Sequence, residues 1–240
     1  MPAVWEGILL PRYEYKYRKP QRRKPRLSSV VMVLILLLLL AYPFFEAYHL
    51  TVDEHTALIP NLPANFKNLR IVYATDIHMG DRFPQWRVNE LIKTINSQSA
   101  DLVLLGGDYA QSSEGAIAFF QNLPRIQARL GVLGTVGDTD RTPPESNLAL
   151  LVKAMTNAGV TPLVNSTARI KVGPTYLYLS GADDYLSGTP AVQGLAATVR
   201  ESDMMIFLGH NPDLLADAIK APGADGDNHW FDLALFGHTH

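Results

Sequence analysis

The 240-residue chain contains no cysteine. This absence excludes disulfide bonds, zinc sites built from thiolates and catalytic thiols. Any metal must therefore be bound by oxygen atoms and imidazole nitrogens, a ligand set that suits Mn, Fe, Zn or Mg. Because 47% of its residues are hydrophobic, the chain can bury the core of one domain and carry an additional segment.

Basic charge is scarce in most of the chain and concentrated at its start. The first 29 residues hold eight Lys or Arg against two Glu, and no charged residue lies between residues 30 and 45. From residue 46 onward, 21 acidic residues oppose 13 basic ones. This balance argues against a nucleic-acid-binding body, so we expect no nucleic-acid partner.

The uncharged stretch at residues 30–45 is an unbroken apolar run, VVMVLILLLLLAYPFF. With its neighbours it approaches the length of a membrane-spanning helix, which predicts a single transmembrane anchor at residues 30–47. The positive-inside rule then places the basic segment 1–29 in the cytoplasm and the later chain on the opposite side of the plasma (inner) membrane. A cleaved signal peptide is the alternative, but Phe45-Glu46-Ala47 lacks the small residues that a cleavage site needs.

A folded domain is predicted at residues 68–240, after a linker at 48–67, because short apolar runs alternate there with amphipathic segments. Helices are expected at 85–96, 114–123 and 144–158, with shorter ones after Pro190 and Pro212. Two strands joined at Gly173-Pro174 indicate mixed rather than purely parallel sheets. Six strand-like runs end at Asp76, Asp108, Asp138, Asp184, His210 and His240.

The residues that end these runs are nearly all of the same few types. Five of the six runs end on Asp or His preceded by Gly or Thr, and ligands bind at the carboxyl ends of strands in α/β sheets. Converging carboxylates repel one another unless cations neutralise them, and the candidates are too many for one ion. We therefore expect two divalent metal ions that share a carboxylate. The candidate ligands are Asp76, His78, Asp108, Asp138, His210, His238 and His240.

These residues lie in five short motifs: Asp76-Ile77-His78, Gly107-Asp108, Gly137-Asp138-Thr139-Asp140, Gly209-His210 and Gly237-His238-Thr239-His240. In order and spacing the motifs resemble the calcineurin-like metallophosphoesterase family, over about residues 69–240, and the anchor resembles its membrane-anchored subgroup. The resemblance implies an α/β four-layer sandwich of two mixed sheets flanked by helices, with bound Mn, Fe or Zn. It also implies that one ion is bound by Asp76, His78 and His240, the other by Asp138, His210 and His238, with Asp108 bridging.

Two features depart from the family pattern. Asp138-Thr139 stands where the family has Asn-His, and Thr139 cannot act as a general acid, a loss expected to cost on the order of 10²-fold in rate. Asp140 and Arg141 are adjacent weak catalytic candidates, and Arg141 is a candidate for the missing cationic contact to phosphate. In addition, the sequence stops at His240 where family members continue, so we expect the domain to be incomplete at its C-terminus.

The expected activity is hydrolysis of a phosphomonoester or phosphodiester, including a lipid-linked one, by water activated between two metal ions. A second hypothesis is a catalytically weak or inactive family member that binds metal or phospholipid as a regulatory or scaffold module; Thr139 favours it. A third is a membrane-tethered α/β domain without metal. The sequence identifies neither the substrate, the metal nor the oligomeric state.

Overall fold

The computed structural model describes residues 27–46, 48–60, 62–143 and 148–239. The chain divides into two compact units, one ending at Glu54 and the other beginning at His55. The first unit contains helix α1 (Leu27–Glu46), which forms where the apolar run predicted a helix and leaves its leucine side chains exposed. No helix in the described part of the chain meets the length and hydropathy required of a membrane span. The predicted transmembrane anchor at 30–47 is therefore not confirmed, and most of the basic segment 1–29 lies outside the described residues.

The first sheet of the second unit has the strand order β1-β2-β3-β4, and all its described pairs are parallel. Its strands are β1 (Ile71–Ala74), β2 (Leu102–Leu105), β3 (Val132–Gly134) and β4 (Val160–Pro162). The helices between them are α2 (Gln85–Ser97), α3 (Ser113–Gln121) and α4 (Leu148–Asn157). Helical crossovers connect β1 to β2, β2 to β3 and β3 to β4, and such connections make neighbouring strands parallel. The expectation of mixed pairing was wrong for this sheet, and β4 was not predicted.

The second sheet is mixed, as expected, with the order β5-β6-β7-β8. Its strands are β5 (Ser166–Val172), β6 (Thr175–Gly181), β7 (Met204–Leu208) and β8 (Leu233–Leu235). β5 and β6 form the predicted antiparallel hairpin, which turns at Gly173 with φ +61°, whereas β6, β7 and β8 are parallel. The predicted short helices are α5 (Val192–Ala196) and α6 (Leu214–Ala218).

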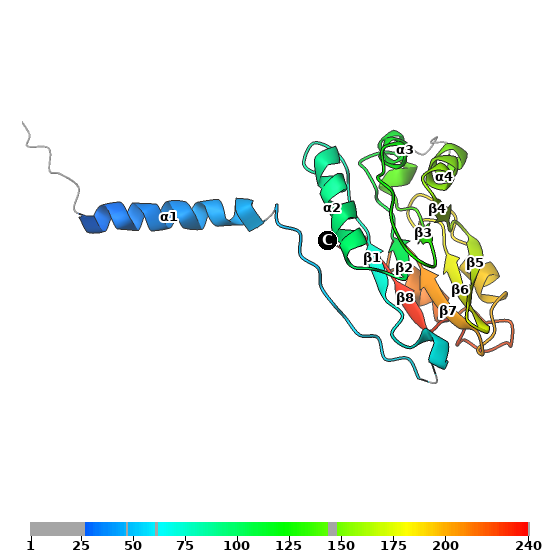
Figure 1. The fold of residues 1–240 in the computed structure, drawn as a ribbon. Helices are drawn as coiled ribbons and strands as arrows, with labels where there is room; N and C mark the ends of the chain where they lie inside the picture. The colour runs from blue at the N-terminus through cyan, green and yellow to red at the C-terminus, as the bar shows by residue number, and fades with distance from the viewer. Residues whose placement is uncertain (1–26, 47, 61, 144–147, 240) are drawn as a thin grey trace, which may run out of the picture. The chain divides into compact units, whose positions relative to one another are not determined.

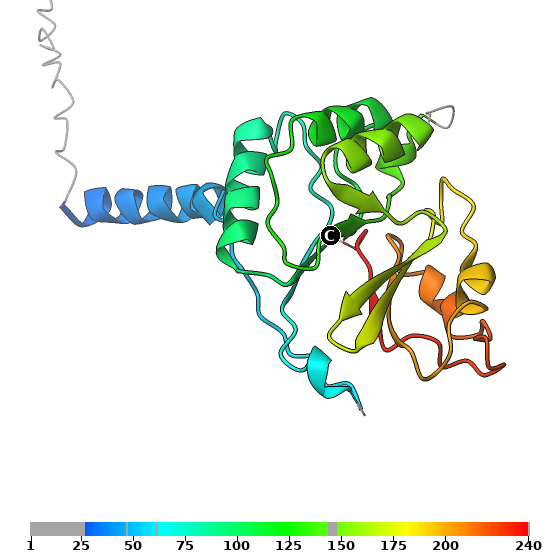
Figure 2. The same cartoon turned by 45° about the vertical axis from the view of Figure 1, so that its right-hand side comes forward.

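Three hydrophobic clusters hold the second unit together. Helices α2, α3 and α4 lie on the side of the first sheet that faces away from the second sheet (Figures 1 and 2). Alternate residues of β2 face opposite sides, so Val103 packs with helices α2 to α4 while Leu104 packs against the second sheet. On the outer side of that sheet, Phe207 and Trp230 pack with the short helices α5 and α6. Most strands are therefore covered on both faces, which explains why they read as continuous apolar runs. The residues of β5 instead alternate between partly buried and exposed.

The carboxyl ends of the two sheets are joined by hydrogen bonds. The Thr135 hydroxyl, just after β3, donates to the Ala182 carbonyl just after β6, at 2.7 Å. The His210 ring, two residues after β7, lies with Nδ1 2.9 Å from the Gly106 carbonyl oxygen, which follows β2. The loops that leave β1, β2, β3, β7 and β8 consequently approach one another, and these loops carry the candidate ligands.

Candidate metal centre

Six of the seven candidate ligands come together in two adjacent clusters. Asp76, His78 and Asp108 form one, and Asp138, His210 and His238 form the other; within each, the potential ligand atoms lie within 4.8 Å of one another. The clusters meet at His210, whose Nε2 lies 3.4 Å from Asp108 Oδ2 and 3.8 Å from Asp76 Oδ1. The seventh candidate, His240, lies outside the described residues.

The first cluster depends on the pairing of two loops that leave neighbouring strands. The Asp76 amide donates to the Gly107 carbonyl at 3.1 Å, and the His78 amide donates to the Asp108 carbonyl at 2.9 Å. Asp76, His78 and Asp108 all have positive φ, at +54°, +47° and +54°. Non-glycine residues adopt this left-handed conformation rarely. The turned backbone departs from regular strand alternation, which allows all three side chains to share one space.

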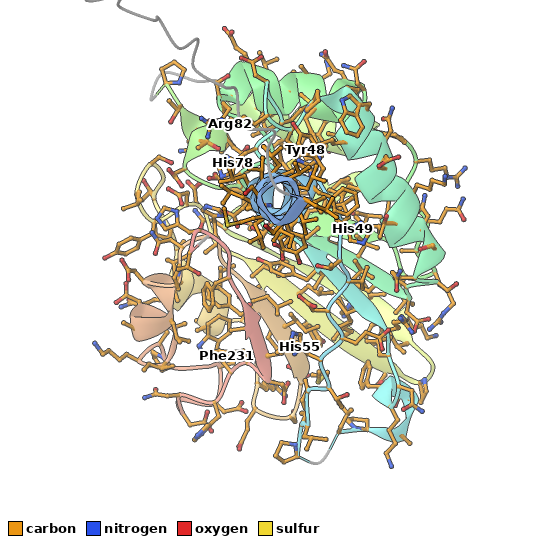
Figure 3. The ribbon with its side chains drawn as sticks, turned by 90° about the vertical axis from the view of Figure 1, so that its left-hand side faces the viewer. Tyr48, His49, His55, His78, Arg82 and Phe231 are labelled. Atoms are coloured by element: carbon orange, nitrogen blue, oxygen red, sulfur yellow. The ribbon has the colours of Figure 1, made fainter. Side chains whose placement is uncertain are left out.

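The Asp76 carboxylate connects the first strand of the domain to the last described one. Its Oδ2 accepts hydrogen bonds from the Thr75 hydroxyl at 2.7 Å and from the His238 amide at 3.0 Å. A Cβ atom at Gly237 would collide with Asp76 Oδ2 and Thr75 Oγ1, so only glycine fits between these loops. The close approach of the β1 and β8 loops thus places His238 beside the other candidate ligands. Figure 3 labels His78 on the segment after β1.

His210 is completely buried and lies between the two clusters. Its Nε2 faces Asp108 Oδ2 and Asp138 Oδ1, both at 3.4 Å. Both His210 Nε2 and Asp138 Oδ1 are buried without a hydrogen-bond partner, a situation that costs about 1–3 kcal/mol for each group. A cation between them would satisfy both atoms. The donor set of imidazole nitrogens and carboxylate oxygens therefore fits a divalent metal ion.

The electrostatics of this region favour a positive charge. Burial lowers the pKa of His210, but the adjacent Asp108 carboxylate more than offsets this effect and raises the pKa to about 9. For Asp108 burial acts in the other direction and raises the pKa of the carboxyl group. His210 and the Thr139 amide lower it more strongly, so the pKa of Asp108 lies below its ordinary value. The carboxylates therefore stabilise a cation in their midst, whether it is a proton on imidazole or a metal ion.

The weak catalytic candidates are both engaged by the protein itself. Asp140 is 1% exposed, and its carboxylate accepts hydrogen bonds from three backbone amides. The Arg141 guanidinium lies with Nη2 3.5 Å from Asp183 Oδ2. The Thr139 hydroxyl donates to the Ala110 carbonyl at 2.7 Å. None of these three side chains belongs to the ligand clusters, so the geometry adds no support to a catalytic role for Asp140 or Arg141.

Several residues that shape the site were not recognised from the sequence. Thr75 directs the Asp76 carboxylate, and its position immediately before Asp76 was the available signal. The Gly106 carbonyl orients the His210 ring, and no sequence pattern marks a main-chain oxygen for such a role. Asp140 is the fourth residue of the third motif, a position that suggested chemistry rather than structural support.

Comparison with known proteins identifies the family. A model of calcineurin-like phosphoesterases matches residues 69–240. The chain is 27% identical to the phosphodiesterase YaeI of Escherichia coli (73% of this chain, 62% of the relative), and 25% identical to an uncharacterized metallophosphoesterase of Aquifex aeolicus (87% and 76%). It is 23% identical to a transmembrane protein with a metallophosphoesterase domain from Bos taurus (76% and 42%). The chain spans about half the length of several curated relatives that it matches. It belongs to the calcineurin-like phosphoesterase family.

Proposed function

We propose that this chain hydrolyses phosphomonoesters or phosphodiesters and uses two divalent metal ions to do so. The observation that supports the proposal is the pair of ligand clusters joined by a distance of 3.4 Å between His210 Nε2 and Asp108 Oδ2. The relatives' names include a phosphodiesterase, which is consistent with this reaction class. Membership of a phosphoester hydrolase family makes hydrolysis the expected chemistry.

The candidate ligands divide between two ions. Asp76 and His78, with His240, would hold one ion, Asp138, His210 and His238 would hold the other, and Asp108 would contact both. Mn, Fe and Zn suit these oxygen and nitrogen donors. When bound, such a pair of ions supplies an activated water and polarises the phosphoryl oxygens. The Gly106 carbonyl can only accept a hydrogen bond, so it takes the His210 Nδ1–H, and His210 would bind an ion through Nε2.

The decisive experiment measures metal content and turnover together. The purified full-length protein, loaded with Mn²⁺, is assayed with p-nitrophenyl phosphate and bis-p-nitrophenyl phosphate beside Asp108→Asn. We expect two Mn²⁺ per chain and turnover that falls at least 100-fold in Asp108→Asn, because an amide cannot supply the shared negative charge. A Mn²⁺-loaded protein without turnover on either compound, or turnover that Asp108→Asn leaves unchanged, would contradict the proposal.

A specific observation favours a second candidate function. Thr139 stands where the resemblance places a histidine, and its hydroxyl is already bound to the Ala110 carbonyl. A chain without that imidazole would suit a regulatory or scaffold module that binds metal or phospholipid with little turnover. Two bound Mn²⁺ ions combined with turnover independent of Asp108 would support this alternative over the hydrolase.

We also propose that α1 attaches the chain to a membrane. The leucine side chains between Leu34 and Leu40 are 55–70% exposed. Relatives from Bos taurus and Danio rerio are named transmembrane proteins. Exposed apolar surface of this extent is typical of a membrane interaction site. Cell fractionation tests the proposal: the full chain should sediment with membranes and resist carbonate extraction, whereas a chain that begins at residue 48 should be released. Recovery of the full chain in the soluble fraction would refute it.

A further inference from the structure

A network of hydrogen bonds joins the loop after β2 to the loop after β3. Two of them end on the Asp140 carboxylate: the Asp108 amide donates to Oδ2 at 2.8 Å and the Tyr109 amide to Oδ1 at 2.9 Å. Within the loop after β3, the Gly137 amide also donates to Asp140 Oδ2, at 2.9 Å. Two more come from Thr139 and reach Asp108 Oδ1 and the Ala110 carbonyl. These hydrogen bonds therefore link Asp108, Tyr109 and Ala110 to the segment that begins at Gly137.

Asp140 stabilises an unfavourable backbone conformation. Asp108 has φ +54° and the preceding Gly107 has φ +97°. A non-glycine residue in this region costs of order 1–3 kcal/mol and persists only where the surroundings support it. The amides of Asp108 and Tyr109, directly at the strained turn, both donate to the buried carboxylate of Asp140. Asp140 thus holds the main chain from which the Asp108 side chain projects.

Thr139 sets the direction of the Asp108 carboxylate. Its amide donates to Asp108 Oδ1 at 3.0 Å, so that oxygen is occupied. The other oxygen, Oδ2, lies 3.6 Å from His78 Nε2 in the first cluster and 3.4 Å from His210 Nε2 in the second. The Thr139 hydroxyl anchors this arrangement by donating to the Ala110 carbonyl at 2.7 Å. Threonine here has a structural contact in place of the histidine expected from the family pattern.

We propose that Thr139 and Asp140 are positioning residues: together they form a clamp that holds Asp108 Oδ2 between the two ligand clusters and so sets the affinity for a pair of metal ions. The clamp acts through Asp108 and touches no substrate. This inference rests on the proposed function, because it presupposes that the two clusters bind two ions.

Titration of the metal-free full-length protein with Mn²⁺ tests the clamp. Calorimetry gives the affinity and stoichiometry, and electron paramagnetic resonance distinguishes a spin-coupled Mn²⁺ pair from isolated ions. In Asp140→Asn, at least one of the three amides must face the side-chain NH₂ group, which cannot accept a hydrogen bond. We expect both Asp140→Asn and Thr139→Val to bind Mn²⁺ 10–100-fold more weakly, as is usual when a residue that supports a metal ligand is lost, and to lose the coupled signal.

Two matched variants separate positioning from general stability. Thr139→Ser keeps the hydroxyl and should retain wild-type affinity and the coupled signal. Asp101→Asn alters a carboxylate that accepts from the Arg70 amide at 3.0 Å. Asp101 lies just before the start of β2, at the opposite end of the strand from Asp108, so this variant should leave Mn²⁺ binding unchanged. Thermal melts of the metal-free proteins confirm folding; if Asp140→Asn does not fold, the comparison of Thr139→Val with Thr139→Ser decides.

The outcomes for the two proposals are distinguishable. A wild-type protein that binds fewer than two Mn²⁺ ions would refute the dinuclear function itself. Two ions bound by the wild type, with affinity and coupling unchanged in the folded Thr139→Val and Asp140→Asn variants, would overturn the clamp alone. Equal weakening in Thr139→Ser and Thr139→Val would also overturn it, because the hydroxyl would then have no part in positioning Asp108.

Discussion

Individual candidate ligands are set apart by their backbone conformation. Asp76, His78, Asp108 and His238 have φ between +47° and +70°. The left-handed conformation costs about 1–2 kcal/mol for a residue with a Cβ atom, and Asp tolerates it better than most. Loop-to-loop hydrogen bonds, such as the one from the His78 amide to the Asp108 carbonyl, hold these turns in place. The ligand loops therefore depend on one another for their shape.

Asp101 offers a residue-scale prediction away from the metal centre. A hydrogen bond from the Arg70 amide, with a smaller contribution from Arg129, lowers the pKa of Asp101 below its ordinary value, although partial burial opposes this. A lowered pKa in the folded state stabilises the protein above the unfolded-state pKa of about 4, and this stability is lost as pH falls through the folded-state value. Asp101→Asn should therefore lower the free energy of unfolding at pH 7 by less than about 1 kcal/mol, since solvent screens the charge of this partly exposed group.

Urea denaturation at several pH values measures this effect. The difference in unfolding free energy between wild type and Asp101→Asn should be constant from pH 7 to pH 5 and shrink below pH 4. A difference that grows as the solution becomes more acidic would show that the carboxylate of Asp101 does not act through its charged form.

Where two ligand loops cross, glycine allows their backbones to pack closely. At Gly137 a Cβ atom would collide with Asp108 Oδ1 and lie 2.7 Å from the Asp108 amide nitrogen. Gly194 in α5 differs, because a Cβ atom there would meet nothing within 4 Å. The same residue type therefore has a packing role after β3 and none on the exposed face of a short helix.

This contrast gives an element-scale prediction. Gly137→Ala should displace Asp108 and weaken Mn²⁺ binding at least tenfold, because backbone and carboxylate must move to admit the methyl group. Gly194→Ala should leave Mn²⁺ binding unchanged and raise the free energy of unfolding by about 0.5–1 kcal/mol, the usual gain for alanine over glycine in a helix. Calorimetric titration and urea denaturation of both variants provide the measurements. Wild-type Mn²⁺ affinity in folded Gly137→Ala would contradict the tight packing of these loops.

The whole domain is arranged so that distant parts of the chain meet at the carboxyl ends of the strands of its two sheets. Asp76 and His238 are 162 residues apart, yet the His238 amide donates to the Asp76 carboxylate. The core between the sheets, which includes Leu104 and Leu177, determines how the carboxyl ends of the two sets of strands face each other. Metal binding at these strand ends should therefore stabilise the entire fold rather than one loop.

Thermal unfolding with and without metal tests this expectation at the scale of the molecule. An ion that binds only the native state adds about 2.7 kcal/mol of stability at a free concentration 100 times its Kd. Mn²⁺ should raise the unfolding temperature of the full-length protein, and EDTA should reverse the rise. Asp108→Asn should abolish most of the shift. An equal rise in Asp108→Asn would place the stabilising ion elsewhere in the chain.

The sequence by itself determined most of the strands and helices and the set of candidate ligands. Apolar runs predicted β1, β2, β3, β6, β7 and β8, and the Gly173-Pro174 turn predicted the β5–β6 hairpin, because these signals are local. The short β4 was missed because Val160–Pro162 contains the polar Thr161 and ends at a proline, so no apolar run marks it. The candidate ligands follow directly from the ends of the predicted strands.

Only the tertiary structure decided how those residues meet. The motif around Asp140 suggested a chemical role, whereas packing buries its carboxylate among three amides of two loops. Likewise, the approach of His210 to Asp108 depends on two sheets whose strands are about a hundred residues apart in the chain. Periodicity reports which face of an element is buried, but the distance between two side chains depends on the packing of every element between them.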